Sequence, residues 1–216
     1  KTETIGQMSC NPAIGGLGKS HLVREVDAMG GIMGQATDRS GIQSRTLNTR
    51  KGFAVQALRV QCDRDKYKQA IQDLLSKTNI IIKDGEVVDL MLQDGGVYGV
   101  ELRTGEKITS TKTILTTGTF LNGVMFKGDE KISGGRVGDD TSIPLSKKLY
   151  DLQLPMGRLK TGTPARIKLS SINTDIMEEQ PGDINPPPMS ALQPPKKILP
   201  QISCYITRTN KKTHQI

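Results

Sequence analysis

The apolar positions of the chain follow a helical period in two segments. In residues 19–29 the apolar side chains are one, three and four positions apart, and Gly30-Gly31 ends the pattern. This predicts an amphipathic helix whose inward face comprises Leu22, Val23, Val26 and Met29. A second helix is predicted from about Asp63 to Lys77, with Asp63 as its N-terminal cap. Its apolar stripe comprises Tyr67, Ala70, Ile71, Leu74 and Leu75.

After the second helix the apolar period changes to that of a strand. Asp94-Gly95-Gly96 and Thr104-Gly105 supply turns between apolar segments, which predicts hairpins. The predicted short strands are 79–82, 86–92, 97–103, 106–109, 113–117 and 203–207. A short helix is predicted from Ser142, and its inward positions are Leu145, Leu149 and Leu152.

Three stretches have no regular apolar period. Residues 6–18 are interpreted as a Gly/Asn/Pro loop, and residues 34–61 as polar and irregular. From Leu154 onward the prolines leave little room for long elements. We therefore predict one domain over residues 1–153 and the start of another over residues 154–216.

Composition limits the partners and the compartment. The 216 residues carry a formal net charge of +8, which favours polyanionic partners but equally fits a solvated basic surface. No segment approaches the roughly 20 apolar residues of a membrane span, so no membrane partner is expected. Cys10, Cys62 and Cys204 form no CxxC pair, and His21 and His214 lack ligand partners. We expect no disulfide framework, no metal site and a reducing, cytoplasmic location.

The first candidate site is the glycine-rich loop that ends at Ser20. Residues 13–20 nearly match the phosphate-loop pattern G-x-x-x-x-G-K-[ST], with Ala13 in place of the first glycine. That pattern requires a buried strand just before it, and Gly-Gln-Met-Ser-Cys-Asn-Pro cannot be a central strand. A structural glycine turn and a loop lining a cofactor are the other interpretations, since glycines let backbone amides approach an anion closely.

Cys10 lies in the same loop, ahead of the predicted helix 19–29. A thiol near a helix N-terminus can have a lowered pKa and act as a nucleophile. A small, buried, apolar cysteine is the alternative interpretation. Cys62 directly precedes a helix and Cys204 lies in a strand-like run, so both are interpreted as structural.

Basic residues beside glycines and hydroxyls form further candidate sites. Arg136 ends the run Ser133-Gly134-Gly135-Arg136, and its guanidinium could hold a phosphate or carboxylate. Arg158, Lys160 and Arg166 flank Thr161-Gly162-Thr163-Pro164, a mixture that suits phosphate contacts. A solvated surface is the alternative interpretation in both places.

The run Thr-Ile-Leu-Thr-Thr-Gly-Thr-Phe, residues 113–120, follows the predicted hairpins. In flavoproteins with a two-dinucleotide-binding fold, an antiparallel excursion leaves a parallel sheet, and the returning strand ends in Thr/Ala-x-Gly near the cofactor. Gly118 and Thr119 would then lie beside the cofactor, because glycine permits close backbone approach.

Taken together, six segments of this chain resemble the large flavin-dependent tRNA uridine carboxymethylaminomethyl-modifying enzymes, the MnmG or GidA family. The segments are GQMSCNPAIGGLGKSHLVREVDAMGG (6–31), RSGIQSRTLN (39–48), TILTTGTFLNG (113–123), SGGRVGDDTSIPLS (133–146), GRLKTGTPARI (157–167) and CYITRTNKKTH (204–214). Residues 9–13 and 160–164 favour this family over the related folate- and flavin-dependent tRNA methyltransferases. Phe53 departs from the usual proline, and Arg208 from the usual histidine.

The resemblance implies a fold, cofactors and partners. The fold would be α/β: residues 1–153 part of a glutathione-reductase-like FAD domain with an antiparallel β excursion, residues 154–216 the start of an inserted substrate-side domain. The activity would be modification of the tRNA wobble uridine at C5, using FAD, NADH and methylene-tetrahydrofolate, with a MnmE-type GTPase partner and a homodimeric assembly. Cys10 would be the catalytic, flavin-proximal cysteine. The cofactor-binding residues would be Asn11, Gly15, Gly16, Val87, Gly118, Thr119 and Ser142.

The family's Gly-x-Gly-x-x-Gly turn would precede Lys1, so we expect this chain alone to bind FAD poorly and to be inactive. Two other function classes stay open. One is a phosphate-loop NTPase built on Ala13–Ser20, and the other is a non-catalytic RNA-binding fragment.

Overall fold

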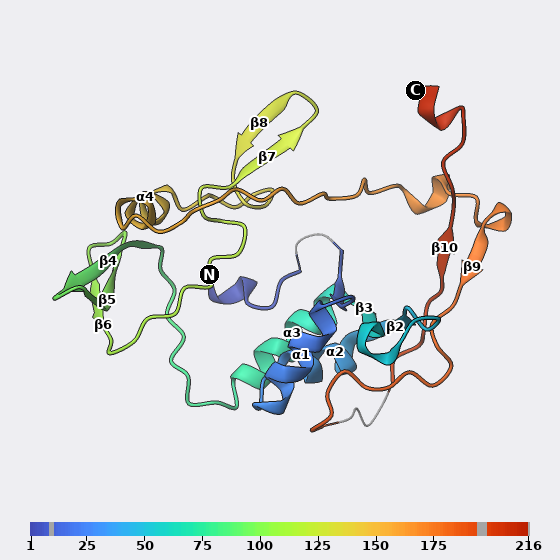
Figure 1. The fold of residues 1–216 in the computed structure, drawn as a ribbon, viewed down its shortest axis with the longest axis horizontal. Helices are drawn as coiled ribbons and strands as arrows, with labels where there is room; N and C mark the ends of the chain where they lie inside the picture. Colours follow the sequence, from blue (N-terminus) through green and yellow to red (C-terminus); the bar gives the residue numbers. More distant parts are fainter. Residues whose placement is uncertain (9–10, 194–197, 216) are drawn as a thin grey trace. The chain divides into compact units, whose positions relative to one another are not determined.

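The structure, a computed structural model, describes residues 1–8, 11–193 and 198–215 (Figure 1). These residues form two compact units. Residues 3–81 and 162–216 form the first, which we call the core unit. Residues 1–2 and 82–161 form the second, which we call the loop unit. Each is described by itself.

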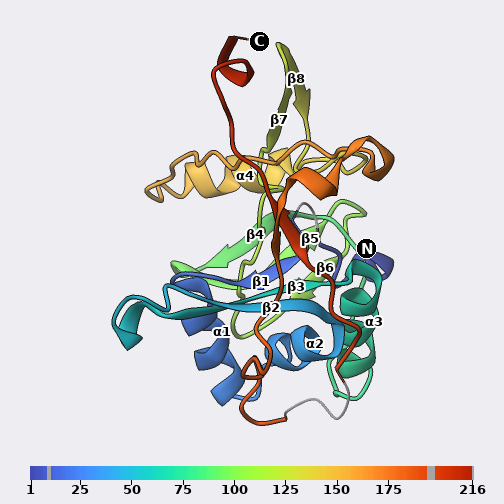
Figure 2. The same ribbon diagram turned by 90° about the vertical axis from the view of Figure 1, so that its right-hand side faces the viewer.

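The core unit contains a three-stranded antiparallel sheet with three helices on one face (Figure 2). The strand order is β1-β3-β2, so β3 is central. The strands are β1 (Ala13–Gly15), β2 (Gly41–Leu47) and β3 (Ala57–Cys62), and the helices are α1 (Lys19–Ala28), α2 (Met33–Ser40) and α3 (Arg64–Leu75). A second pair joins β9 (Glu178–Gln180) to β10 (Cys204–Ile206), which confirms the predicted strand at 203–207. Short 3-10 helices occur at Thr2–Thr4, Phe53–Val55, Leu169–Ser171, Thr174–Ile176 and Thr213–Gln215.

The predicted cap of α3 is confirmed. The Asp63 carboxylate accepts hydrogen bonds from the backbone N–H groups of Asp65 and Lys66, each at 3.1 Å. These bonds satisfy two donors that the first turn of a helix leaves without an intrahelical partner. Tyr67, Ala70, Ile71 and Leu74 of the predicted stripe are buried, and Leu75 packs against them.

The prediction that residues 34–61 are irregular is wrong, because this segment forms α2, β2 and β3. Helix α2 shows no apolar period, yet it is largely buried. Its hydroxyl groups are satisfied within the helix: Thr37 Oγ1 donates to the Met33 carbonyl and Ser40 Oγ to the Ala36 carbonyl, each at 2.7 Å. Burial of a polar helix is tolerated when its side chains are hydrogen-bonded in this way.

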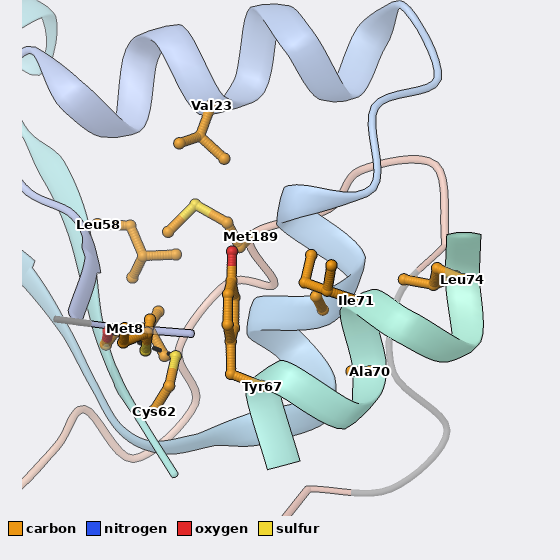
Figure 3. Close-up of a cluster of buried hydrophobic side chains, with 11 residues drawn as sticks. Met8, Val23, Leu58, Cys62, Tyr67, Ala70, Ile71, Leu74 and Met189 are labelled. Carbon is orange, nitrogen blue, oxygen red and sulfur yellow. Dashed lines mark hydrogen bonds between the residues drawn. The ribbon is translucent and has the colours of Figure 1, made fainter. Parts of the chain in front are cut away.

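The apolar core of the core unit lies between the sheet and the helices (Figure 3). Leu58, Val60 and Cys62 alternate along β3 and face the helices, as the two-residue period of a strand requires. Val23 of α1 points toward Leu58 and Met189. Met189 is fully buried although it belongs to the proline-rich region, so that region completes the core.

Helix α1 exists as predicted, but its predicted inward face is mostly wrong. Of the four apolar residues assigned to that face only Val23 is buried, while Leu22, Val26 and Met29 are exposed. The buried positions are Ser20, Val23 and Asp27, spaced three and four residues apart. The buried face of α1 is therefore mostly polar, and the spacing of apolar residues along the sequence cannot reveal such a face.

Residues 180–191, here called the return segment, run along β2 and the helices. The Asp183 N–H donates to the Ser44 carbonyl at 2.8 Å, and the Thr46 N–H donates to the Asp183 carboxylate at 2.7 Å. Asp38 accepts from the Met189 and Ser190 N–H groups at 2.7 and 2.8 Å. The return segment thus covers the edge strand β2, which would otherwise present unpaired backbone groups.

The loop unit contains a meander, a hairpin and one helix. The meander comprises β4 (Val87–Gln93), β5 (Gly96–Leu102) and β6 (Lys107–Thr109), which pair in that order. The hairpin comprises β7 (Val124–Lys127) and β8 (Glu130–Ser133), and the helix is α4 (Ile143–Asp151). Leu145 and Leu149 pack on Leu90, with Leu152 beside them, which confirms the predicted inward positions of α4.

Two predicted strands are absent from the part of the chain that the structure describes, namely 79–82 and 113–117. Residues 80–82 pair with no strand among the described residues, and their apolar side chains are exposed. The hairpin β7–β8 was not among the predicted strands. The compact units divide near residues 82 and 161, and the predicted domain boundary near residue 153 stays a prediction.

The fold is α/β, as predicted, and every strand pair among the described strands is antiparallel. That the fold forms part of an FAD-binding domain stays a prediction. Among the described helices, none is long and apolar enough to cross a lipid bilayer.

Candidate functional site

Four of the sequence-predicted cofactor residues meet in the loop unit. Ser142 Oγ lies 3.4 Å from the carbonyl oxygen of Val87, to which it donates a weak hydrogen bond. The Ser142 N–H donates to the Phe120 carbonyl at 2.9 Å, directly after the turn at Gly118 and Thr119. Val87 and Ser142, which are 55 positions apart in the sequence, are thus in direct contact. We call this group, residues 87, 118–123 and 133–142, the loop cluster.

Close backbone contacts hold the loop cluster together. A Cβ added at Gly123 would lie 2.5 Å from the Thr119 carbonyl oxygen, and one at Gly135 would lie 2.7 Å from the same atom. Only glycine permits these approaches. Gly118 differs, because a Cβ there would meet nothing within 4 Å. Glycine is favoured at position 118 because the backbone φ is +59°, and the side of the backbone where a Cβ would stand is open.

Arg136 and Arg158 both have partners inside the loop unit. The Arg136 guanidinium forms an ion pair with Asp139 at 2.6 Å and lies over the Phe120 ring, 5.5 Å from its centroid. Its positive charge lowers the pKa of the Asp139 carboxyl, chiefly through their hydrogen bond. Arg158 donates two hydrogen bonds to the Asn122 carbonyl, each at 3.2 Å. These arginines brace the loops, and a phosphate would have to compete with those bonds.

The remaining basic candidates are exposed. Lys160 belongs to the loop unit and Arg166 to the core unit, and both lie outside helices and strands. Their predicted contact with phosphate stays a prediction.

The glycine loop of the core unit uses its amides internally. The Gly16 N–H donates to the Leu58 carbonyl at 2.8 Å, and the Lys19 and Ser20 N–H groups donate to the Gly16 carbonyl at 3.1 and 3.0 Å. Ser20 Oγ donates to the same carbonyl at 3.2 Å. In a phosphate loop these donors would point at the anion instead.

Two further features argue against the NTPase alternative. Strand β1 is a three-residue edge strand that runs antiparallel to β3, whereas a phosphate loop follows a buried strand. A Cβ at Gly15 would lie 2.3 Å from the Leu58 carbonyl oxygen, so this glycine is required for packing. Asn11 is exposed, and Cys10 lies outside the described residues. The roles of Asn11, Gly15 and Gly16 in binding a cofactor stay predictions.

An open pocket of about 190 Å³ adjoins the first turns of α1. It contains no acidic side chain, and its charged or titratable members are His21 and Arg24. The Arg24 guanidinium donates to the Pro188 carbonyl at 2.8 Å, and His21 Nε2 lies 3.2 Å from the Ala54 carbonyl. The lining residues are Ser20, His21, Arg24, Thr46, Gln56, Ala57, Leu58 and Pro187.

Burial controls the titration of two groups in the core unit. It raises the pKa of the Cys62 thiol to about 11, so this cysteine stays protonated at neutral pH, as expected for a structural residue. Burial also raises the pKa of the Asp38 carboxyl, against the lowering effect of its two backbone hydrogen bonds. Cys204 is half-buried, and its thiol donates to Gln43 Oε1 at 3.2 Å.

The sequence-based predictions missed the two acidic residues that hold the return segment, Asp27 and Asp38. Asp27 Oδ2 accepts from the Ala191 N–H at 2.8 Å, while Asp27 Oδ1 is buried without a partner among the described residues. The only available signal was the position of Asp27, four residues after Val23 on the inward face of α1.

Comparison with solved structures defines the class of fold. The structure of GidA from Aquifex aeolicus matches in two crystal forms, each with a TM-score of 0.90 and 44% sequence identity over 100% of this chain. The model of the family "Glucose inhibited division protein A" matches residues 1–216. The chain belongs to the GidA family.

Among curated relatives, the tRNA uridine 5-carboxymethylaminomethyl modification enzyme MnmG of Wolinella succinogenes is 49% identical over 99% of this chain. The match covers 35% of that relative and 37% of each Aquifex aeolicus chain, so this chain spans about a third of their length.

Proposed function

We propose that the complete protein modifies the wobble uridine of tRNA at C5. The observation that carries this proposal is the 49% identity to an MnmG enzyme over 99% of the chain. The basic character of the chain, with a net charge of +8, suits an RNA substrate. A MnmE-type GTPase partner, a homodimeric assembly and a cytoplasmic location belong to the same proposal.

FAD is the proposed cofactor, and the loop cluster offers a fit for it. Val87 begins β4, Ser142 directly precedes α4, and the open face at Gly118 lets a planar group approach the backbone. When bound, FAD would supply the redox chemistry by which a one-carbon unit from methylene-tetrahydrofolate reaches uridine C5, with NADH as the reductant. Val87, Gly118, Thr119 and Ser142 would position it.

Cys10 is the proposed nucleophile or acid at the reacting carbon. In the sequence it stands among polar residues ahead of β1 and α1, and a thiolate close to the N-terminal end of a helix is stabilised. Cys10→Ser in the complete protein should lower turnover at least tenfold, which corresponds to about 1.4 kcal/mol of barrier. Cys62→Ser is the matched control and should leave turnover nearly intact, because its thiol is buried in the core.

The function is tested by nucleoside analysis. The gene should restore the modified wobble uridine, detected by mass spectrometry, in bacteria that lack their own enzyme. The purified complete protein should show flavin absorbance, whereas this chain alone should bind FAD poorly. Unmodified tRNA in the complemented cells would overturn the proposed activity. Stoichiometric FAD on residues 1–216 alone would overturn the expectation that further segments are needed.

A further inference from the structure

A run of positive charge without acidic residues lies in the core unit. Between Asp38 and Asp63 the sequence contains no aspartate or glutamate. The five cations of this run are Arg39, Arg45, Arg50, Lys51 and Arg59. Arg39 lies in the last turn of α2, and the other four cations lie in β2, β3 and the loop 48–56 between them, here called the β2–β3 hairpin.

Two of these arginines lie directly opposite each other. In the antiparallel register Arg45 of β2 pairs with Arg59 of β3, so both side chains project from the same face of the sheet. That face is opposite the one on which Leu58 and Val60 pack into the core. Like charges placed directly across a strand pair destabilise a sheet unless an anion lies near them.

The carboxylate beside this pair in the described part of the chain, that of Asp183, accepts from the Thr46 N–H at 2.7 Å. Neither Arg45 nor Arg59 forms an ion pair there, and the one recorded hydrogen bond joins Arg45 Nη1 to the Pro181 carbonyl at 3.1 Å. Both side chains are only half-buried. Two cationic side chains on one face of the sheet, neither of them ion-paired, can each donate to the phosphates of a polyanion.

The loop of the hairpin presents an aromatic ring beside further cations. Phe53 is 90% exposed and follows Arg50 and Lys51. The loop is held by its own bonds: the Lys51 N–H donates to the Asn48 carbonyl at 2.8 Å, and Gln56 Nε2 donates to the Lys51 carbonyl at 3.2 Å. The ring is therefore displayed by an ordered turn, and burial does not explain it.

We propose that the β2–β3 hairpin is an RNA-binding element that holds an unpaired segment of the substrate tRNA. Arg45 and Arg59 each contact a backbone phosphate, and Phe53 stacks on an unpaired base, with Arg50 and Lys51 adding phosphate contacts. A basic groove with an aromatic side chain is the usual means of holding single-stranded nucleic acid. An acidic peptide would neutralise the arginines but would leave the exposed ring without a role. The inference rests on the proposed function, because it takes tRNA as the substrate.

Fluorescence anisotropy with a labelled anticodon stem–loop tests the proposal in the complete protein. Phe53→Ala should weaken binding about 5- to 150-fold, the range that stacking of one base supplies, and Phe53→Trp should retain it. The matched control is Phe126→Ala, which removes another exposed phenylalanine, 67% exposed, from β7. It should leave binding unchanged.

The arginines are tested by the salt dependence of binding. Arg45→Gln and Arg59→Gln should each reduce the slope of log affinity against log salt by about 0.7, the value for one phosphate contact on a single strand. The control Lys77→Gln, an exposed cation just beyond α3, should not change the slope. Arg59→Gln should leave the melting temperature of the RNA-free protein unchanged or raised, because it removes a like-charge pair.

The outcomes separate this inference from the proposed function. If the wild-type protein does not bind the RNA at all, the proposed function itself fails. If it binds but Phe53→Ala behaves like Phe126→Ala, only the inference is overturned. It is also overturned if Phe53→Ala lowers the melting temperature without changing RNA affinity, which would show that other parts of the protein cover the ring. Arginine variants that keep RNA affinity but lose the GTPase partner would likewise overturn it and identify a protein interface.

Discussion

The core unit and the loop unit are stabilised in different ways. In the core unit three helices and a sheet enclose a cluster of eleven buried residues. In the loop unit only Leu90, Leu145 and Leu149 form the buried cluster, and glycine contacts, backbone hydrogen bonds and ion pairs hold the rest. Apolar burial is the larger source of stability, so the core unit should be the more resistant to unfolding.

The same contrast applies to the candidate sites. The loop unit assembles its predicted cofactor residues on loops that satisfy their own backbone groups and leave Gly118 open. The glycine loop of the core unit directs its amides to protein carbonyls, and the Arg45 and Arg59 pair lies on the β2–β3 hairpin. A glycine-rich sequence therefore has different consequences in the two units.

Leu58→Ala should produce the largest loss of stability. The side chain is buried at the centre of the core unit, and such truncations cost about 2–5 kcal/mol. Urea unfolding measures the effect, with Leu159→Ala as the control because Leu159 is 97% exposed. Equal stability of the two variants would show that the cluster around Leu58 is not the main source of stability.

Gly123→Ala should destabilise the loop unit selectively. The added Cβ would lie 2.5 Å from a backbone oxygen, and overpacking of this kind costs about 1–3 kcal/mol. Hydrogen exchange followed by mass spectrometry should show faster exchange in peptides from 117–142, with the core unit unchanged. Gly157→Ala, where a Cβ meets nothing within 4 Å, should have no such effect.

Asp38→Asn should loosen the return segment by about 1–2 kcal/mol, since an amide cannot accept from both N–H groups as the carboxylate does. The pKa of the Asp38 carboxyl is raised in the folded protein. Protonation of Asp38 therefore stabilises the folded state fully below the unfolded-state pKa, and this stabilisation is lost as the pH rises through the folded-state pKa.

The neighbouring charges of Asp27 and Arg24 act on the pKa of Asp38 in opposite directions, and burial outweighs both. The difference in unfolding free energy between wild type and Asp38→Asn, measured from about pH 3 to pH 7, should therefore decrease with rising pH. A difference that grows with pH would mean that the backbone hydrogen bonds outweigh burial.

Arg103→Gln should have the smallest effect. Arg103 forms a two-bond ion pair with Glu86 at 2.6 and 2.7 Å, and this pair lowers the pKa of Glu86. Both side chains are partly exposed, and exposed pairs contribute about 1 kcal/mol or less. Thermal unfolding at low and high salt would measure it. A loss as large as that of Leu58→Ala would invalidate the contrast drawn between the two units.

The sequence by itself determined the features that depend on local periodicity. The helix α3 with its Asp63 cap, the meander β4–β6 and the inward leucines of α4 were predictable because a repeating apolar pattern or a capping residue marks each. The family resemblance was likewise contained in contiguous segments. It pointed to Val87 and Ser142 as residues of one site.

Only the tertiary structure decided which polar residues are inside. Helix α2, the buried stripe of α1 and the return segment depend on hydrogen bonds between groups far apart in the sequence, such as Asp38 with Met189 and Ser190. An apolar pattern carries no record of such bonds, because a buried polar group is tolerated wherever a partner reaches it. The pairing of Arg45 with Arg59 is of the same kind, since only the strand register places the two residues opposite each other.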